Sequence, residues 1–474
     1  MPTTAALLRV VQSGRDWASS RDARLSLGVG HRVDFSWAIG ECWSVSVSSE
    51  GAVGVVGAGG SGIAVGTALQ RAGIEFEILE ARDGVGGTWR YDPSGDGSAC
   101  YESLVANTSK LRMQMSGRKM GGRPWQYAPH DEMLTYLESI VDSEDIRPRL
   151  RLGWRVAAAN HADGVWTLRS DRGEERRYHA LICALGVNGR PRWAPLPGDF
   201  VGDQLHSASY RTPERFKDRD VVVIGLGTSG SEVAGEVANH ARSVVVAVRT
   251  PMWAMTRRLA GFPLDWLDNP TLARVLPWSL RRRTIAGLCM LTTGGLRRHG
   301  IQRPTRRCGD DIIAISDTFP RAVRRGLIDI RPAIDRVEGD EIRFTDGSTV
   351  RADAIVHATG FELPTEFLPA DARPDKHPLY HGIAHPGAPD LYFVGLIEAH
   401  RALLQIAEAQ AAWTANVLSG RVELPPPAQQ VAVAQEEAGR RSRDFGDHRP
   451  FLVDAARYIA SLRRERARRP SVAT

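Results

Sequence analysis

Two glycine-rich segments of this 474-residue chain have the GxGxxG spacing that binds the pyrophosphate of a dinucleotide. Each follows a short apolar, β-branched run, at residues 53–56 and 221–224. In this motif the first glycine makes a tight turn, the second lets the backbone approach the phosphates, and the third lets the helix pack on the strand. The helix N-terminus then offers free N–H groups to the anion. The predicted cofactor-binding residues of the two segments are Gly57, Gly59, Gly60, Ser61 and Gly62, and Gly225, Gly227, Thr228, Ser229 and Gly230.

Two such motifs on one chain indicate two nucleotides held face to face, with electron transfer between them, whereas one motif alone would be weak evidence. The residue after the second strand of each unit tells the nucleotides apart. Glu80 lies 18 residues after Gly62 and can accept hydrogen bonds from ribose hydroxyls. Arg249 stands at the corresponding place in the second unit, where a guanidinium can bind a 2′-phosphate that a carboxylate would repel. We therefore predict FAD at the first site and NADPH, rather than NADH, at the second. The alternative for Arg249 is a solvated charge at a strand end.

The elements around these motifs predict an α/β fold with two Rossmann-like dinucleotide-binding domains. After the first βαβ unit we expect a helix that begins near Asp131 and an antiparallel excursion around residues 154–168. A buried strand at 179–184 should return to the first sheet. Residues 351–360 resemble a further strand that ends in a glycine turn. We therefore expect the NADPH domain to be inserted into a discontinuous FAD domain.

The expected domain boundaries follow from this pattern. Residues 1–52 have no steady helical or strand period, so we expect a disordered N-terminal extension or a start assigned too far upstream. The FAD domain should occupy 53–212 and resume at 346–424, with the NADPH domain at 213–345 between them. A proline linker and a C-terminal helix should occupy 425–474.

Composition excludes several other classes of protein. The chain is 42% hydrophobic and 24% charged, as expected of a globular enzyme, and its net charge of +6 comes with no nucleic-acid-binding motif. Its five cysteines are scattered without a CxxC pair, which argues against a disulfide reductase and favours a reducing, cytoplasmic location. The histidines show no HExxH spacing, and no metal site is predicted.

No run of 18 apolar residues is present, so no membrane-spanning helix is predicted. The apolar segment at 284–291 has arginines on both sides and could touch a membrane surface, although a core helix is the preferred interpretation.

A third motif lies between the two glycine segments, where Phe200, Gly202, His206 and Tyr210 have the spacing FxGxxxHxxxY. This segment resembles the signature of class B flavin-dependent monooxygenases, the flavin-containing monooxygenase family. Other segments resemble parts of the same family in the same order: the GGxW turn at Gly86, Gly87, Thr88 and Trp89, the asparagine-bearing segment at Asn107–Lys110, and the ATGY/F turn at Ala358, Thr359, Gly360 and Phe361. The resemblance covers roughly residues 53–462.

The resemblance implies an enzyme that uses NADPH to reduce FAD and then traps O2 on the reduced flavin as a C4a-(hydro)peroxide. One oxygen atom would go to a small organic substrate and the other to water. It also implies that Gly87, Thr88, Trp89, Asn107, Thr359 and Gly360 contact the cofactors.

Three residues are the catalytic candidates under this resemblance. Asn107 would hydrogen-bond to flavin or peroxide through a neutral amide, and its alternative role is to cap a local turn. His206 and Tyr210 would lie at the junction of the two domains, where they could couple NADPH binding to domain geometry or act as structural linkers. For His206 we favour structural coupling over proton transfer.

Tyr210 also bears on the reaction, because Baeyer–Villiger enzymes of this superfamily usually carry tryptophan at that position. Tyrosine therefore favours N- or S-oxygenation, or the oxidation catalysed by the plant YUCCA type. Ala184-Leu185-Gly186 departs from the family's usual ATG, which leaves the substrate class open. The alternatives are a Baeyer–Villiger monooxygenase acting on ketones and an NADPH oxidase flavoprotein that oxygenates no substrate. The sequence predicts neither the substrate itself nor the oligomeric state.

Overall fold

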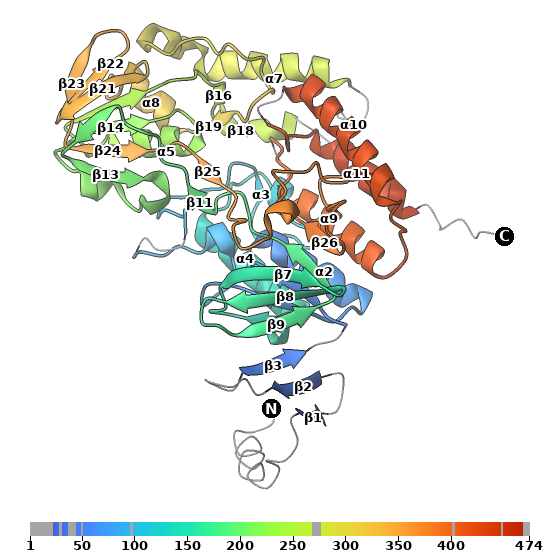
Figure 1. Ribbon diagram of the computed structural model, residues 1–474. Helices are drawn as coiled ribbons and strands as arrows, with labels where there is room; N and C mark the ends of the chain where they lie inside the picture. The colour runs from blue at the N-terminus through green and yellow to red at the C-terminus, as the bar shows by residue number, and fades with distance from the viewer. Residues whose placement is uncertain are drawn as a thin grey trace.

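A computed structural model describes residues 22–27, 31–36, 44–48, 51–94, 98–267, 276–400, 403–446 and 449–467. Two parallel sheets dominate it, and each carries one of the glycine segments at the carboxyl end of a strand. Figure 1 shows the two sheets in separate halves of the molecule, with the C-terminal helices alongside both. This confirms the predicted α/β fold with two dinucleotide-binding units.

The first sheet has the strand order β26-β10-β4-β5-β6, and all of its pairs are parallel. Its central strands are buried on both faces, which explains why their sequences are continuous apolar runs rather than alternating ones. Helices α2, α4 and α9 pack around it. The bounds are β4 (Val53–Val56), β5 (Phe76–Leu79), β6 (Leu150–Arg151), β10 (Ala180–Cys183), β26 (Leu391–Phe393), α2 (Gly60–Ala72), α4 (His130–Ser143) and α9 (Leu403–Leu418).

The second sheet repeats this plan with the order β13-β24-β14-β15-β20, again with all pairs parallel. Helix α5 follows β14, and α8 packs against α5 before the chain enters β20. The bounds are β13 (Asp203–His206), β14 (Asp220–Ile224), β15 (Ser243–Ala247), β20 (Asp329–Arg331), β24 (Ala354–His357), α5 (Thr228–Val237) and α8 (Thr318–Arg324).

The second sheet corrects part of the expected domain layout. Strands β13 and β24 were expected in the two halves of the FAD domain, but both pair within the second sheet. A short apolar strand followed by a glycine turn looks the same in either sheet, so the sequence pattern could not assign β24. The second unit therefore begins before residue 213 and continues past residue 345.

The predicted antiparallel excursion is present as β7 (Val156–Ala162), β8 (Val165–Ser170) and β9 (Glu175–Tyr178). Three strands of the expected disordered extension continue this sheet, namely β1 (Asp22–Leu27), β2 (His31–Ser36) and β3 (Ser44–Ser48). The alternation of serine and valine over 44–48 was a period-2 signal for a strand. The other residues of 1–50 lie outside the described part of the chain.

Shorter elements complete the structure. On the second unit, β12 (Gly198–Phe200), β21 (Ile334–Gly339), β22 (Glu341–Phe344) and β23 (Thr349–Arg351) form a small sheet. The remaining elements are β11 (Arg190–Pro191), β25 (Phe361–Glu362), β16 (Ala254–Met255), β19 (Ala314–Ile315), β17 (Arg258–Leu259), β18 (Phe262–Pro263), α3 (Lys110–Met113), α7 (Trp278–Thr293), and the 3-10 helices η2 (Gly87–Trp89), η3 (Arg147–Arg149), η4 (Ser207–Ser209), η5 (Pro213–Phe216), η6 (Leu264–Leu267), η7 (Gly294–His299) and η8 (Ala370–Ala372).

Helix α7 contains the apolar segment 284–291. Ile285 and Cys289 are buried in a core cluster, whereas Met290 and Leu291 are exposed. The segment is thus a helix that packs through one face only. Among the described helices, none combines the length and apolar character needed to cross a membrane.

The C-terminal region holds two helices where one was expected, α10 (Pro427–Phe445) and α11 (Ala455–Ala467). Pro427 is the first residue of α10, a position at which proline loses no helical hydrogen bond. The run of prolines at 425–427 therefore ends the linker, and its last proline begins helix α10.

His381 holds both C-terminal helices onto the first unit. Its Nδ1 lies 2.7 Å from Glu437 Oε1 of α10, and its Nε2 lies 2.9 Å from Glu465 Oε2 of α11. Burial alone would lower the pKa of His381, but the hydrogen bonds and charges of the two carboxylates outweigh it and raise the pKa to about 9. The imidazolium form is therefore the one that the folded chain favours.

This clamp should make stability depend on pH. A histidine whose pKa is raised by folding contributes its full stabilisation below the unfolded pKa of about 6.5, and loses it as pH rises through about 9. We expect His381→Asn, which tolerates the positive φ at this position, to lower the free energy of unfolding by ~2 kcal/mol near pH 6.5. The deficit should shrink towards zero above the folded pKa. Denaturant unfolding of both proteins across this range measures it, and a deficit that does not change with pH would contradict the assignment.

Candidate functional site

The first glycine segment forms the tight strand–turn–helix connection that its spacing predicts. Gly57 has φ of 102°, and a Cβ there would lie 2.6 Å from the Ala184 carbonyl oxygen at the end of β10. A Cβ on Gly62 would lie 1.8 Å from the carbonyl oxygen of Gly57. Only glycine therefore fits at either position. The N-terminus of α2 is left with free N–H groups at the edge of the sheet.

The second segment repeats this geometry. Gly225 also has φ of 102°, and a Cβ on it would lie 2.6 Å from the Ala358 carbonyl oxygen at the end of β24. A Cβ on Gly230 would lie 2.1 Å from the Gly225 carbonyl oxygen. By contrast, a Cβ on Gly227 would meet no atom within 4 Å, so the middle glycine faces open space. Both segments thus fit a dinucleotide pyrophosphate over the start of a helix.

The predicted GGxW turn lies against the first segment. The backbone N–H of Gly86 donates to the Ala58 carbonyl oxygen at 2.9 Å. A Cβ on Gly87 would lie 2.9 Å from the Cα of Gly59. Thr88 and Trp89 continue from this contact in η2. The structure therefore brings the turn and the first phosphate loop together.

Glu80 is buried beside the same loop. Its Oε2 accepts a hydrogen bond from the Ala58 N–H at 2.7 Å, and its Oε1 accepts one from the Arg82 N–H at 3.0 Å. The carboxylate thus supports the loop, and each oxygen keeps a lone pair for a ribose hydroxyl. The position of Glu80 after β5 is the one that the sequence predicted.

Gly395 was missed by the sequence analysis. It follows β26 with φ of 90°, and a Cβ there would lie 2.2 Å from Ser61 Oγ. Its N–H donates to Gln410 Oε1 of α9 at 2.9 Å. Gly395, just after β26, therefore lies against the start of α2. The apolar run that ends in glycine at 391–395 could have indicated this position from the sequence.

Thr359 and Gly360 lie at the second segment rather than the first, because they follow β24. The Thr359 carbonyl oxygen accepts hydrogen bonds from Arg192 Nε at 3.1 Å and Nη2 at 2.9 Å, and Gly360 has φ of 89°. This corrects their expected place in the FAD domain. Arg249, two residues after β15, is exposed and forms no ion pair with any described residue.

His206 and Tyr210 flank η4 in the segment that links the two units. His206 is buried at the end of β13, where its Nδ1 accepts a hydrogen bond from the Ala208 N–H at 3.1 Å, and burial lowers the pKa of its imidazole. Tyr210 is buried beneath α5 and donates to Glu236 Oε2 at 2.8 Å, and burial together with Glu236 raises its pKa. The Tyr210 contact attaches the linking segment to the second unit, whereas the His206 contact caps η4 within that segment.

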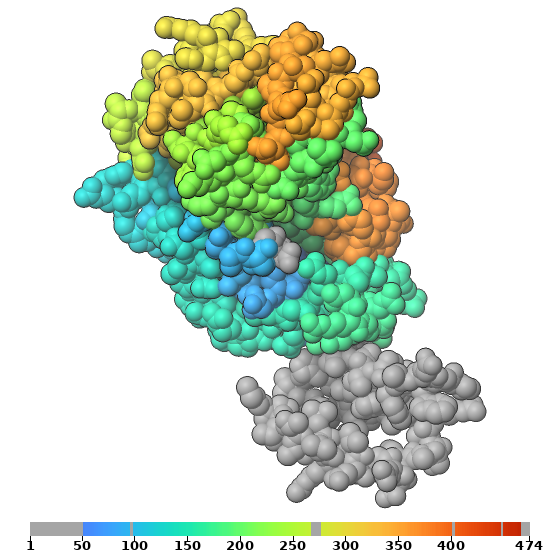
Figure 2. Space-filling view, turned by 90° about the vertical axis from the view of Figure 1, so that its left-hand side faces the viewer, coloured from blue at the N-terminus to red at the C-terminus, as the bar shows by residue number. Residues whose placement is uncertain are grey.

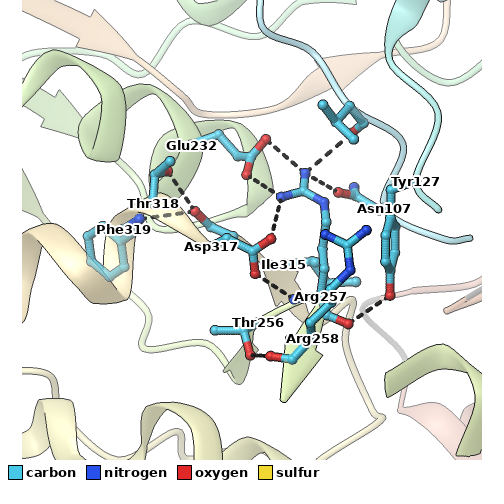
Figure 3. A network of polar contacts seen from close by, with 12 residues as sticks. Asn107, Tyr127, Glu232, Thr256, Arg257, Arg258, Ile315, Asp317, Thr318 and Phe319 are labelled. Carbon is cyan, nitrogen blue, oxygen red and sulfur yellow. Dashed lines mark hydrogen bonds and ion pairs between the residues drawn. The ribbon is translucent and has the colours of Figure 1, made fainter. Parts of the chain in front are cut away.

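Asn107 is exposed, and its amide is held by a buried arginine. Its Oδ1 accepts a hydrogen bond from Arg257 Nη2 at 3.2 Å. Arg257 in turn pairs with Glu232 of α5 through two contacts of 3.0 Å. Figure 3 shows the Arg257 guanidinium with Asn107 on one side and both Glu232 and Asp317 on the other. The candidate amide therefore contacts the second unit although it belongs to the first.

The acidic side chains of α5 hold the whole segment that precedes Asn107. Tyr101 donates to Glu232 Oε2 at 2.9 Å, and Ser103 donates to Glu236 Oε1. The sequence analysis missed Glu232, Glu236 and Arg257. The two glutamates are four residues apart on one helix face, but no sequence pattern shows that they meet Tyr101 and Ser103, over a hundred residues away.

No group of three or more histidine, cysteine or acidic side chains suited to a metal ion occurs among the residues that the structure describes. The four described cysteines, Cys100, Cys183, Cys289 and Cys308, are buried as free thiols.

Comparison with known proteins gives one concordant result. The model of the family described as flavin-binding monooxygenase-like matches residues 50–473. Human flavin-containing monooxygenase 1 is 28% identical over 418 residues, covering 83% of this chain and 78% of the relative. The S-allyl-L-cysteine S-oxygenase of Allium sativum superimposes with a TM-score of 0.65 at 23% identity, covering 88% of this chain and 89% of that one. A closed crystal structure of cyclohexanone monooxygenase gives 0.69 at 19% identity, covering 88% and 97%. These two structural likenesses concern the fold.

The glycine contacts predict which substitutions abolish cofactor binding. Gly62→Ala places a methyl group against the Gly57 carbonyl oxygen and should reduce the FAD content of the purified protein at least tenfold, because the phosphate loop cannot close on the helix. Gly287→Ala is the matched control: it lies in α7, its Cβ meets no atom within 4 Å, and alanine should stabilise the helix by up to ~1 kcal/mol. Flavin absorbance per mole of protein measures both. Full flavin content in Gly62→Ala would refute the placement of the first site.

Proposed function

Because this chain belongs to the flavin-binding monooxygenase-like family, and is a flavin-dependent monooxygenase that uses FAD and NADPH, we propose that it transfers one oxygen atom of O2 to a nitrogen or sulfur atom of a small organic substrate. The family membership carries the redox chemistry. The choice of a heteroatom as oxygen acceptor rests on the electrostatics around Asn107.

The observation that carries the proposal is the charge balance at Asn107. N- or S-oxygenation uses a neutral, electrophilic oxygen donor, whereas Baeyer–Villiger oxidation of a ketone uses an anionic, nucleophilic one. The cation that contacts Asn107 is Arg257, and two carboxylates pair with it, Glu232 at 3.0 Å and Asp317 at 3.7 Å. A guanidinium paired in this way stabilises a developing anion far less than a lone guanidinium would. Tyr210 in place of the tryptophan usual in Baeyer–Villiger enzymes agrees with this choice.

The two glycine segments would hold the two cofactors. Gly57, Gly59 and Gly62 would place the FAD pyrophosphate at the start of α2, with Glu80 on its ribose. Bound FAD supplies the redox chemistry, accepting a hydride from NADPH and activating O2. Gly225 and the other residues of its segment would place NADPH at the start of α5 in the same way.

The chain's own polar groups then orient and shield the reacting atoms. Asn107 would donate a hydrogen bond to the bound cofactors from a neutral group, which adds no charge to the site. His206, with a lowered pKa, is a neutral imidazole at physiological pH, so its proposed role is to hold the junction of the units rather than to shuttle protons. Tyr210 would act with it by anchoring the linking segment to α5.

Product analysis tests the proposed reaction. Purified, FAD-loaded protein is supplied with NADPH, O2 and in turn a tertiary amine, an aryl alkyl sulfide and a cyclic ketone. We expect an N-oxide or sulfoxide in proportion to the NADPH consumed. A lactone from the ketone, with the amine and the sulfide unchanged, would replace the proposal by Baeyer–Villiger oxidation. Stoichiometric H2O2 with every substrate would show an oxidase.

Arg249 should set the preference for NADPH over NADH. Removing a charge-assisted contact to the 2′-phosphate costs ~1.5–3 kcal/mol, so Arg249→Ala should raise the KM for NADPH roughly ten- to a hundredfold and leave the KM for NADH unchanged. Arg242→Ala is the control, because Arg242 is an exposed arginine at the opposite end of β15, paired with Asp220. Steady-state kinetics with both nucleotides measure the effect. Equal changes in the two KM values would show that Arg249 does not read the 2′-phosphate.

A further inference from the structure

Arg257 is one of the most deeply buried charges near the site. Its side chain is 7% exposed, and it pairs with Glu232, which is equally buried. The contact is bidentate, with Nη1 at 3.0 Å from Oε1 and Nη2 at 3.0 Å from Oε2. A buried ion pair is weak evidence for stability alone, because desolvation of both charges offsets most of the attraction. The remaining contacts of Arg257 therefore indicate a role beyond stability.

Those contacts fall on three successive residues at the candidate amide. Arg257 Nη2 donates to the Val105 carbonyl oxygen at 3.3 Å and to Asn107 Oδ1 at 3.2 Å, and Nε donates to the Ala106 carbonyl oxygen at 3.3 Å. Arginine can only donate hydrogen bonds, so the oxygen of the Asn107 amide must face it. The NH2 group of Asn107 must then point away from the arginine. Arg257 thereby sets which end of this amide is presented to the site.

The far side of Arg257 is tied to the second dinucleotide unit. Glu232 lies on α5, two residues after Gly230, the last glycine of the phosphate loop. The backbone N–H of Arg257 donates to Asp317 Oδ1 at 2.8 Å, directly before α8. A shift of α5 when a nucleotide binds at its N-terminus would thus reach Asn107 through a single side chain. Figure 2 shows the half of the molecule that carries α5 seated on the half that carries residues 98–107.

We propose that Arg257 is a positioning residue, which together with Glu232 forms a clamp that turns the Asn107 NH2 group towards the bound cofactors and couples its orientation to NADPH binding at α5. This inference rests on the proposed function. Arg257 and Glu232 act through Asn107 and do not touch the reacting atoms.

A second buried ion pair provides the matched control. Arg281 of α7 pairs with Asp454, and each side chain is 7% exposed, as in the clamp. Arg281 stacks on Trp278 and lies in a different part of the chain from both phosphate loops. Lysine in place of either arginine keeps the charge but loses the planar, forked donor. Both substitutions should therefore lower the melting temperature. If Arg257 had a purely structural role, its substitution would have no further effect.

The experiment compares Arg257→Lys with Arg281→Lys in the FAD-loaded protein. We expect Arg257→Lys to weaken NADP⁺ binding at least fivefold by calorimetry and to raise the H2O2 released per NADPH severalfold, because the amide no longer holds its orientation. Arg281→Lys should leave both quantities within twofold of wild type. The proposal is overturned if the two variants behave alike in both measurements.

Asn107→Asp tests the donor directly and serves if Arg257→Lys does not fold. Aspartate accepts the Arg257 hydrogen bond as well as asparagine does, but it has no NH2 group. We expect a melting temperature near that of wild type, with H2O2 release raised as in Arg257→Lys. Wild-type coupling in this variant would show that the NH2 group is not used. If wild type itself yields only H2O2 with every substrate, the proposed oxygenation fails, while the NADP⁺ affinities of the two lysine variants still decide the clamp.

Discussion

The close approach of a glycine to the end of a neighbouring strand is the constraint on which both halves of this protein depend. At Gly57 and at Gly225 a Cβ would lie 2.6 Å from the carbonyl oxygen of an alanine, Ala184 or Ala358, that directly follows the adjacent parallel strand. The turn can form only if the two strands end in register, as Cys183 does with Val56. The same contact thus sets the turn, the start of the helix and the position of the third strand.

This repeated constraint explains why the two strand–turn–helix segments could be predicted from the sequence while their surroundings could not. The glycine with positive φ and the glycine packed against the helix start are required at fixed spacing, so they form a motif that can be read from the sequence. Glu80 follows the first motif at a distance that the βαβ unit dictates. The sheet that β24 joins, by contrast, depends on pairing between residues over a hundred positions apart. The local sequence pattern of β24 is the same whichever of the two sheets it joins, so the sequence analysis placed Thr359 and Gly360 in the wrong unit.

The polar network around Asn107 illustrates the same limit at the level of side chains. Asn107 could be singled out because it resembles a family segment, but Arg257 is one of many arginines in a basic chain. Its importance arises from burial. Because water cannot reach the guanidinium, each of its N–H groups is costly unless a protein atom accepts a hydrogen bond from it. Tyr210 was singled out by its motif as a candidate at the junction of the domains, and its hydroxyl anchors the linking segment to Glu236.

Together these contacts give α5 two tasks. Its N-terminus faces the second phosphate loop. Further along the helix, Glu232 and Glu236 lie one turn apart and bind the segment 101–107 of the first unit. The carboxylates of Glu232 and Asp317 outnumber the guanidinium of Arg257, so the join between the units leaves no unbalanced cation beside the candidate amide. This suits the transfer of oxygen to an electron-rich nitrogen or sulfur, because an unbalanced cation there would favour an anionic oxygen donor instead. The reaction proposed for this chain is therefore tied to how its two halves are held together.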